Sequence, residues 1–256
     1  MNIVLIGYGK MGRILEDTAL GQGHRIVAII DPFVPLERSA RGAVILKSIA
    51  DLKSGNVAAA IDFTRPDSAL PTIKAMAQLK VPLVIGTTGW YDSLPEAIEV
   101  VERAGSSLLY ASNFSLGVNL FYKVAACAAK LFDPFGEYDV AGYEMHHNKK
   151  ADSPSGTTKT LVEKVLSQMT RKSTPVYDAL NRAPKSEELH FSSLRLGSVP
   201  GVHSLLFDSG ADTIEITHSA RNREGFASGA IVAAQWLAGN GRKQGVFTFD
   251  QVLDTF

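Results

Sequence analysis

Short, uninterrupted apolar runs alternate with amphipathic segments over the first part of the chain. The apolar runs have the length of buried strands and cover residues 3–6, 26–30, 57–63, 81–85 and 108–110. Apolar side chains recur at helical spacing in the segments between them, which are residues 11–21, 67–79 and 94–104. Strands without polar alternation that are separated by helices are typical of a parallel sheet covered on both faces. The pattern therefore predicts a Rossmann-type, doubly wound α/β fold.

The pattern changes after Asn113. A long helical stretch covers residues 118–132, and a strand-like apolar segment follows at 140–145. Three more strand-like runs, separated by glycine-containing turns, follow at residues 191–196, 202–207 and 213–218. One further helix is expected at 225–237. These elements predict a second, α+β domain with a mixed, mostly antiparallel sheet.

Composition and charge narrow the classes of function. The 256 residues are 45% hydrophobic and 20% charged, which is ordinary for a globular protein. Lys and Arg number 26, as do Asp and Glu, so no overall basic field favours binding of nucleic acid or an anionic membrane. The first residues lack the features of a signal peptide and no apolar run is long enough for a membrane span, so neither is expected. The single cysteine, Cys127, is expected to be buried in a core, and one cysteine cannot form a disulfide within the chain. A reducing compartment is therefore indicated, and the chain is predicted to be cytoplasmic.

A glycine-rich loop follows the first predicted strand. Gly7-Tyr8-Gly9-Lys10-Met11-Gly12 lies between this strand and a helix. The first glycine permits a tight turn, the second lets the backbone approach a pyrophosphate, and the third allows close helix packing. The next strand ends at Asp31, nineteen residues beyond Gly12, where a carboxylate would bind the ribose hydroxyls of adenosine. The loop therefore predicts a site for a nicotinamide dinucleotide.

Two later strand ends supply further candidates for cofactor binding. In open parallel sheets, ligands bind beyond the carboxyl ends of the strands. Small and hydroxyl residues at these ends can line a nicotinamide cleft, with simple turn formation as the alternative. The candidates are Gly86, Thr87, Thr88, Ala111, Ser112, Asn113 and Phe114.

The choice between NADH and NADPH depends on charges near the ribose. Asp31 would repel a 2′-phosphate, and the following Pro32 offers no positive charge to offset it. Lys10 could accommodate the phosphate from the glycine turn, although a solvated surface lysine is an equal alternative. We expect NADH to be preferred, or both cofactors to be used.

Residues 144–157 hold the densest group of reactive side chains. His146, His147 and two lysines precede a Ser-Pro-Ser-Gly-Thr segment typical of a helix start, whose N–H groups suit a carboxylate. Reduction of a C=C or C=N bond needs a hydride on one atom and a proton on its neighbour. His146 or Lys150 can supply that proton, with a charged, solvated loop as the alternative. No cysteine or helical His-x-x-x-His spacing completes a metal site, so no metal is expected.

The run His146-His147-x-x-Lys150-x-Asp152-x-Pro154-Ser155-Gly156-Thr157 resembles the signature of the dihydrodipicolinate reductase family. Agreement with the family extends to residues 7–12, 86–89, 113–119 and 215–218. The resemblance implies NADH- or NADPH-dependent reduction of 4-hydroxy-tetrahydrodipicolinate, by way of dihydrodipicolinate, in lysine and diaminopimelate biosynthesis. The chain departs from the family pattern at Pro32, where a basic residue is frequent, and at Ser198 and Val202, which replace acidic residues.

The resemblance also implies roles for the residues of the signature. His146 would be the acid/base proton donor, and Lys150 would be a second donor near the ring nitrogen of the substrate. The carboxylates of this small dicarboxylate would be held by His147, Gly156 and Thr157.

A domain organisation follows from the same resemblance. Residues 1–114 and 220–256 would form the dinucleotide-binding domain, with a C-terminal helix that returns to it. Residues 115–219 would form the substrate-binding and oligomerisation domain, whose sheet would build a homotetramer.

Two other functions stay open on the sequence alone. One is a different NAD(P)-dependent dehydrogenase of an amino-acid precursor, and the other is a nicotinamide-sensing protein without catalysis. The remaining histidines are expected to be structural: His24, His190, His203 and His218.

Overall fold

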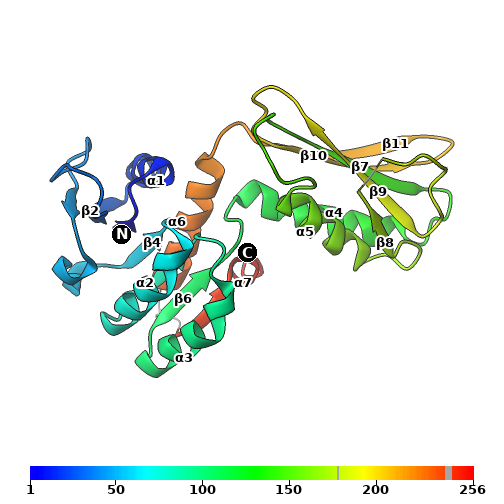
Figure 1. The fold of residues 1–256 in the computed structure, drawn as a ribbon. Helices are drawn as coiled ribbons and strands as arrows, with labels where there is room; N and C mark the ends of the chain where they lie inside the picture. The colour runs from blue at the N-terminus through cyan, green and yellow to red at the C-terminus, as the bar shows by residue number, and fades with distance from the viewer. Residues whose placement is uncertain (178, 240–243) are drawn as a thin grey trace. The chain divides into compact units, whose positions relative to one another are not determined.

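The chain forms two compact units, and the first is built from both ends of the sequence (Figure 1). The computed structural model describes residues 1–177, 179–239 and 244–256. One unit comprises Met1–Leu116 and Arg223–Phe256, and the other comprises Gly117–Asn222. Within the described residues, no helix combines the length and the apolar character of a membrane span.

The first unit contains a seven-stranded sheet in the order β12-β6-β5-β4-β1-β2-β3, in which every pairing is parallel. Its strands are β1 (Asn2–Ile6), β2 (Arg25–Ile30), β3 (Val44–Leu46), β4 (Ala59–Asp62), β5 (Leu83–Ile85), β6 (Ser107–Tyr110) and β12 (Gly245–Thr248). The predicted doubly wound fold is confirmed. The two edge strands are absent from the prediction: β3 lies in an apolar run at residues 43–46 that the prediction does not include, whereas β12 has only two apolar residues between Gly245 and Thr248.

Each face of this sheet carries its own hydrophobic core. Ile3 and Leu5 of β1 face the first core, which includes residues of α1 (Lys10–Gly21), α6 (Glu224–Ala238) and α7 (Phe249–Leu253). Val4 and Ile6 face the second core, with α2 (Pro66–Gln78) and α3 (Leu94–Ala104). Three short 3-10 turns complete the unit at Ile49–Asp51, Ser54–Asn56 and Tyr91–Ser93. Burial on both faces explains why these strands lack polar alternation.

Close packing at the first turn of α1 requires glycine. A Cβ atom at Gly12 would lie 2.2 Å from the carbonyl oxygen of Gly7, which is much shorter than a normal contact. Gly7 itself has a φ of +89°, a conformation that favours glycine. The two glycines therefore allow the strand, the loop and the helix to approach one another.

The second unit contains a five-stranded sheet in the order β11-β10-β7-β9-β8. The predicted mixed sheet is confirmed, but it is not mostly antiparallel, because two of its four pairings are parallel. Its strands are β7 (Asp139–His146), β8 (Thr174–Val176), β9 (Glu188–Arg195), β10 (Val202–Asp208) and β11 (Thr213–Ser219). The β10–β11 and β10–β7 pairings are antiparallel, whereas β7–β9 and β8–β9 are parallel. Buried residues of α4 (Leu116–Phe132) and α5 (Gly156–Leu166) pack with Val140, Phe191 and Leu205 on one face of this sheet.

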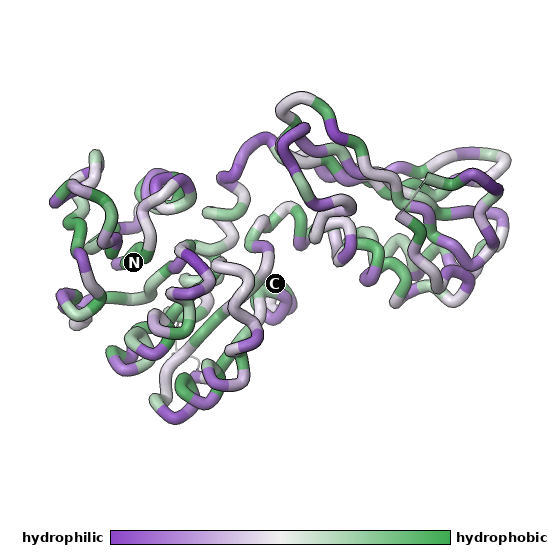
Figure 2. The backbone as a smooth tube through the Cα atoms, viewed as in Figure 1, coloured by the Kyte–Doolittle hydropathy of each residue, from purple (hydrophilic) through white to green (hydrophobic). Residues whose placement is uncertain are grey.

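Cys127 lies on the exposed side of α4, so the expectation of a buried thiol is wrong. Figure 2 colours much of α4 as hydrophobic, but one helix can turn only part of its circumference toward a sheet. The buried stripe includes Tyr122, Ala125 and Ala129, and Cys127 lies outside it, on the same side as the exposed Val124. An apolar run in a helix therefore does not establish that each of its residues is buried.

Candidate active site

The predicted cofactor residues of the first unit gather at one edge of its sheet. The glycine loop follows β1, Phe63 follows β4, Gly86 follows β5 and Ala111 follows β6, and all four strands are parallel. Backbone hydrogen bonds tie these ends together, because Phe63 donates to Ile6 and Gly86 donates to Asp62. The structure thus places the candidates along the carboxyl ends of adjacent strands, the usual ligand position in this fold.

The glycine loop has the shape that a pyrophosphate group needs. Gly9 is the N-cap of α1, and a Cβ atom there would meet no atom within 4 Å. The first N–H groups of a helix lack intrahelical partners and are available to an anion. The N–H of Tyr8 donates to the Asp31 carboxylate at 2.8 Å, which places that acid beside the loop. These observations fit a dinucleotide held by the loop and by Asp31.

The remaining cofactor candidates differ in what they can offer to a ligand. The Tyr8 side chain is buried and donates to Glu16 at 2.5 Å, so only its backbone lies in the loop. Phe114 is also buried and packs against Phe63 and Phe249. Exposed side chains are those of Lys10, Thr88 and Ser112, and partly buried residues are Met11, Gly86, Ala111 and Asn113. Thr87 is buried.

Asp62 organises two of the strand ends and is absent from the sequence-based candidates. One carboxylate oxygen accepts hydrogen bonds from the N–H of Thr64 at 2.7 Å, its hydroxyl at 2.6 Å, and the Thr87 hydroxyl at 3.2 Å. The other oxygen, Oδ2, is buried and has no hydrogen-bond partner among the described residues. Burial raises the pKa of Asp62 to about 6, against the opposing effect of hydrogen bonds from Thr64 and Thr87.

Replacing Asp62 with Asn is expected to change how stability depends on pH. The folded protein binds more protons than the unfolded chain between about pH 4 and pH 6, so ionisation of Asp62 lowers stability as the pH rises. Ionisation of the buried Asp62 lowers the free energy of unfolding by about 3 kcal/mol at neutral pH, because its pKa is raised from 3.8 to about 6. Asn keeps the accepting oxygen without the charge. Urea unfolding should show the variant gaining stability over wild type as the pH rises; a pH-independent difference would contradict this.

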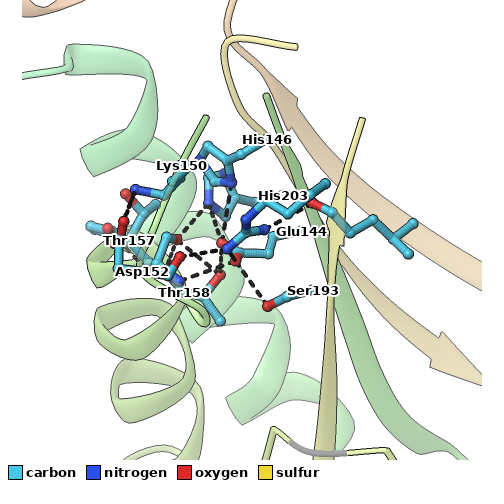
Figure 3. A network of polar contacts seen from close by, with 12 residues as sticks. Glu144, His146, Lys150, Asp152, Thr157, Thr158, Ser193 and His203 are labelled. Atoms are coloured by element: carbon cyan, nitrogen blue, oxygen red, sulfur yellow. Dashed lines mark hydrogen bonds and ion pairs between the residues drawn. The ribbon is translucent and has the colours of Figure 1, made fainter. Parts of the chain in front are cut away.

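Glu144 is the centre of a buried polar network in the second unit (Figure 3). Its Oε1 accepts from the Ser155 N–H at 3.1 Å, the Ser193 hydroxyl at 2.9 Å and the Arg195 guanidinium at 3.1 Å. Its Oε2 accepts from the Thr158 hydroxyl at 2.8 Å. Burial alone would raise the pKa of Glu144, but the surrounding donors outweigh burial and hold it well below its usual range. Glu144 is therefore an anion.

His146 lies two residues from Glu144 on β7, so the two side chains project from the same face of the sheet. Its Nδ1 is 3.4 Å from Glu144 Oε2, and its ring stands 5.1 Å from that of His203, centroid to centroid. Burial lowers the pKa of His146 to about 4, and the charge of Glu144 opposes this shift. The predicted proton donor thus lies beside a fixed negative charge.

The other signature residues lie around the start of α5. The Lys150 ammonium forms an ion pair with Asp152 at 2.8 Å, and the Lys150 N–H donates to the His147 carbonyl in a turn. Ser155 is the N-cap of α5 and accepts from the Thr158 N–H at 3.1 Å. Gly156 and Thr157 follow in the first turn, where N–H groups lack intrahelical partners. The structure thus brings the signature residues together, with a helix start next to two candidate proton donors.

Several members of the network are absent from the sequence-based site residues, and these include Glu144, Thr158, Ser193, Arg195 and His203. His203 was expected to be structural, but it lies opposite Glu144 in the β10–β7 ladder, with its Nε2 3.5 Å from Oε2. Ser193 lies opposite Glu144 on the other neighbouring strand. The sequence carries a signal for Glu144, since it begins the segment 144–157 and an acid within a strand is unusual.

Glu144, His146 and His203 also present ligand-type atoms within 4.8 Å of one another. The Arg195 guanidinium lies 3.1 Å from Glu144 and would repel a metal cation there. Hydrogen-bond donors already surround the carboxylate. These contacts explain the cluster as a polar network, and the absence of a metal remains a prediction.

Two family models together match almost the entire chain. The model "Dihydrodipicolinate reductase, N-terminus" matches residues 1–114, and the model "Dihydrodipicolinate reductase, C-terminus" matches residues 117–253. The chain belongs to the dihydrodipicolinate reductase family. This membership confirms the resemblance noted in the sequence and disfavours the two other functions considered there.

Relatives of this family cover the chain from end to end. The 4-hydroxy-tetrahydrodipicolinate reductase of Christiangramia forsetii is 37% identical over 99% of this chain and 98% of its own. That of Staphylococcus aureus is 35% identical over 98% of this chain and 100% of its own. A dipicolinate-bound dihydrodipicolinate reductase from Paenisporosarcina sp. TG-14 has a TM-score of 0.78 at 22% identity, covering 97% of each chain. This last similarity supports the shared fold.

Proposed function

We propose that the chain reduces 4-hydroxy-tetrahydrodipicolinate, by way of dihydrodipicolinate, to tetrahydrodipicolinate in lysine and diaminopimelate biosynthesis. The observation that carries the proposal is the match to this family over nearly the whole chain. The segment with the family signature also forms a compact group of acid, imidazole and ammonium side chains beside the start of α5. That group suits proton delivery to an anionic substrate.

The cofactor is NADH or NADPH, and it supplies the hydride when bound. We assign its binding to the domain of residues 1–114 and 220–256. The glycine loop would hold the pyrophosphate at the start of α1, and Asp31 would bind the adenosine ribose. The strand ends after β5 and β6 would line the nicotinamide. Preference for NADH is favoured by Asp31 and Pro32, whereas the exposed Lys10 favours acceptance of NADPH as well.

The substrate is a small dicarboxylate, and we assign its binding to the domain of residues 115–219. Gly156 and Thr157 at the start of α5, together with His147, would hold its carboxylates. His146 would donate the proton, and Lys150 would act as a second donor near the ring nitrogen. Negative charge of the bound substrate would raise the pKa of His146 from its low value in the free protein and so favour its protonation.

Replacing Lys150 with Ala is expected to raise KM for the substrate and lower kcat, each by about 10- to 100-fold, because a charged hydrogen bond is lost. Lys150 is largely buried, with 22% of its side chain exposed, and its ion pair with Asp152 holds the ammonium beside the start of α5. Steady-state kinetics would measure both constants. The exposed Lys159 on α5 provides a matched control, Lys159→Ala, which should behave as wild type. Unchanged constants for Lys150→Ala would remove it from the mechanism.

We also propose a cytoplasmic homotetramer, built through the face of the second sheet opposite α4 and α5. That face carries the apolar side chains of Met145, Leu194 and Leu206, none of which belongs to a buried core. A cytoplasmic location suits a nicotinamide-dependent biosynthetic step and a chain with one unpaired cysteine. Light scattering of the purified protein would test the assembly, and a mass of one or two chains would contradict it.

The reaction is tested by following nicotinamide absorbance while a preceding synthase makes the substrate from pyruvate and aspartate semialdehyde. Oxidation that requires every component would support the proposal, and parallel assays with NADH and NADPH would establish cofactor preference. Cofactor binding without oxidation would leave the nucleotide site standing and refute the substrate assignment.

A further inference from the structure

Glu144 is held more rigidly than the reaction itself explains. It is fully buried, and it receives side chains from both neighbouring strands, with His203 opposite it on β10 and Ser193 opposite it on β9. The start of α5 covers it through Ser155 and Thr158. Three separate elements therefore fix the position and the charge of one carboxylate.

The two oxygens of this carboxylate have different surroundings. Oε1 accepts from three donors, on Ser155, Ser193 and Arg195, which leave it little capacity for another. Oε2 accepts from Thr158 and also faces two imidazole nitrogens, Nδ1 of His146 at 3.4 Å and Nε2 of His203 at 3.5 Å. One oxygen is thus anchored, while the other is directed toward the two histidines.

His146 Nδ1 is buried and has no hydrogen-bond partner within the part of the chain that the structure describes. When the ring carries both protons, Oε2 of Glu144 is the acceptor beside this nitrogen. On the other side of the ring, a methyl group at Gly201 would stand 3.1 Å from Nε2, so glycine there keeps Nε2 uncovered. The arrangement directs Nδ1 toward the carboxylate and leaves Nε2 for proton transfer.

We propose that Glu144 and His203 are positioning residues for His146, with opposite effects on its protonation. This inference rests on the proposed function of His146 as the proton donor. Glu144 orients the ring through Nδ1 and stabilises the imidazolium form. His203 approaches the same oxygen, Oε2, so it draws on the same negative charge and opposes protonation of His146.

The charges around His146 agree with this division of roles. Among the groups that face it, Glu144 on the same strand is the one that raises its pKa, whereas burial comes first among the effects that lower it. His203 on β10, Lys150 in the loop and Arg195 on β9 also lower its pKa. Loss of Glu144 would therefore leave His146 among groups that all disfavour its charged form.

Two substitutions in the full chain test the proposal by shifts in opposite directions. Glu144→Gln should move the limb of the kcat–pH profile that reports His146 to lower pH, by about 1 to 3 units, because an adjacent opposite charge is lost. His203→Gln should move the same limb to higher pH. Glu144→Asp keeps the negative charge, so its limb should lie closer to that of wild type than the limb of Glu144→Gln does. His24→Gln is the control, because His24 belongs to the first unit and should leave the limb unchanged.

NMR titration of the His146 ring in each variant, with isotope-labelled histidine, provides a readout that does not require turnover. If wild type fails to reduce the substrate, the proposed function is refuted, but the opposite shifts of the His146 pKa should still be observed. Limbs and NMR pKa values that stay at the wild-type position while kcat falls would overturn the proposal, as would shifts in the same direction. Should Glu144→Gln fail to fold, His203→Gln and Glu144→Asp still decide the question.

Discussion

Replacing His146 with Gln is expected to lower kcat by roughly 10²- to 10⁴-fold, the usual contribution of a positioned acid or base. Gln retains a polar side chain of similar reach but cannot exchange a proton near neutral pH. His146 lies at the end of β7 in the second unit, whereas the predicted nucleotide residues belong to the first unit. Affinity for NADH, measured by fluorescence titration, should therefore be unchanged.

The His146→Gln result is interpretable only beside a second histidine variant. His24→Gln alters a partly buried histidine in the first unit and should preserve turnover. Single-turnover measurements at saturating cofactor would separate the chemical step from product release. Wild-type turnover in His146→Gln would exclude the residue as the proton donor and leave Lys150 as the remaining candidate.

Two substitutions in the glycine loop should separate folding from cofactor binding. Gly12→Ala should lower the free energy of unfolding by about 2 kcal/mol or more, because its Cβ would lie 2.2 Å from a backbone oxygen. Gly9→Ala should leave stability unchanged, since its Cβ would meet open space. The same open space is where the pyrophosphate is expected, so Gly9→Ala should weaken NADH binding by about tenfold, or about 1.4 kcal/mol.

Gly21→Ala is the matched control for the helix itself. Gly21 is the last residue of α1, its Cβ would meet no atom within 4 Å, and alanine should be neutral or slightly stabilising there. Denaturant unfolding and NADH titration of the three variants would measure both effects. Wild-type stability in Gly12→Ala, or wild-type affinity in Gly9→Ala, would contradict the geometry assigned to the loop.

The parts of the fold that depend on local sequence were predictable. Apolar runs predict the strands at 3–6 and 26–30, and helical spacing predicts the helix between them. The position of the glycine loop follows, because it connects the first strand to this helix. The strands β8 and β12 were missed because neither has more than two consecutive apolar residues, so neither forms a recognisable apolar run. Their positions are decided by the strands they pair with rather than by their own composition.

The candidate site shows the same limit. His146 and Lys150 are close in sequence, and local spacing was enough to place them together. His203 is far along the chain, and its place opposite Glu144 follows from the register of two antiparallel strands. Register depends on pairing between distant segments, which one sequence does not reveal. Asp62 was missed for a related reason, because its partner Thr87 lies on another strand end.

The return of the chain to its first unit also governs the order in which that unit can be completed during synthesis on the ribosome. Residues of α6 and α7, including Ile231, Leu237 and Val252, form part of the core on one face of the first sheet. Until these last residues have been translated, α1 covers only part of that face, and the rest of its apolar surface remains in contact with water. The second unit is continuous in sequence, so it can finish folding before the last helices of the first unit have been synthesised.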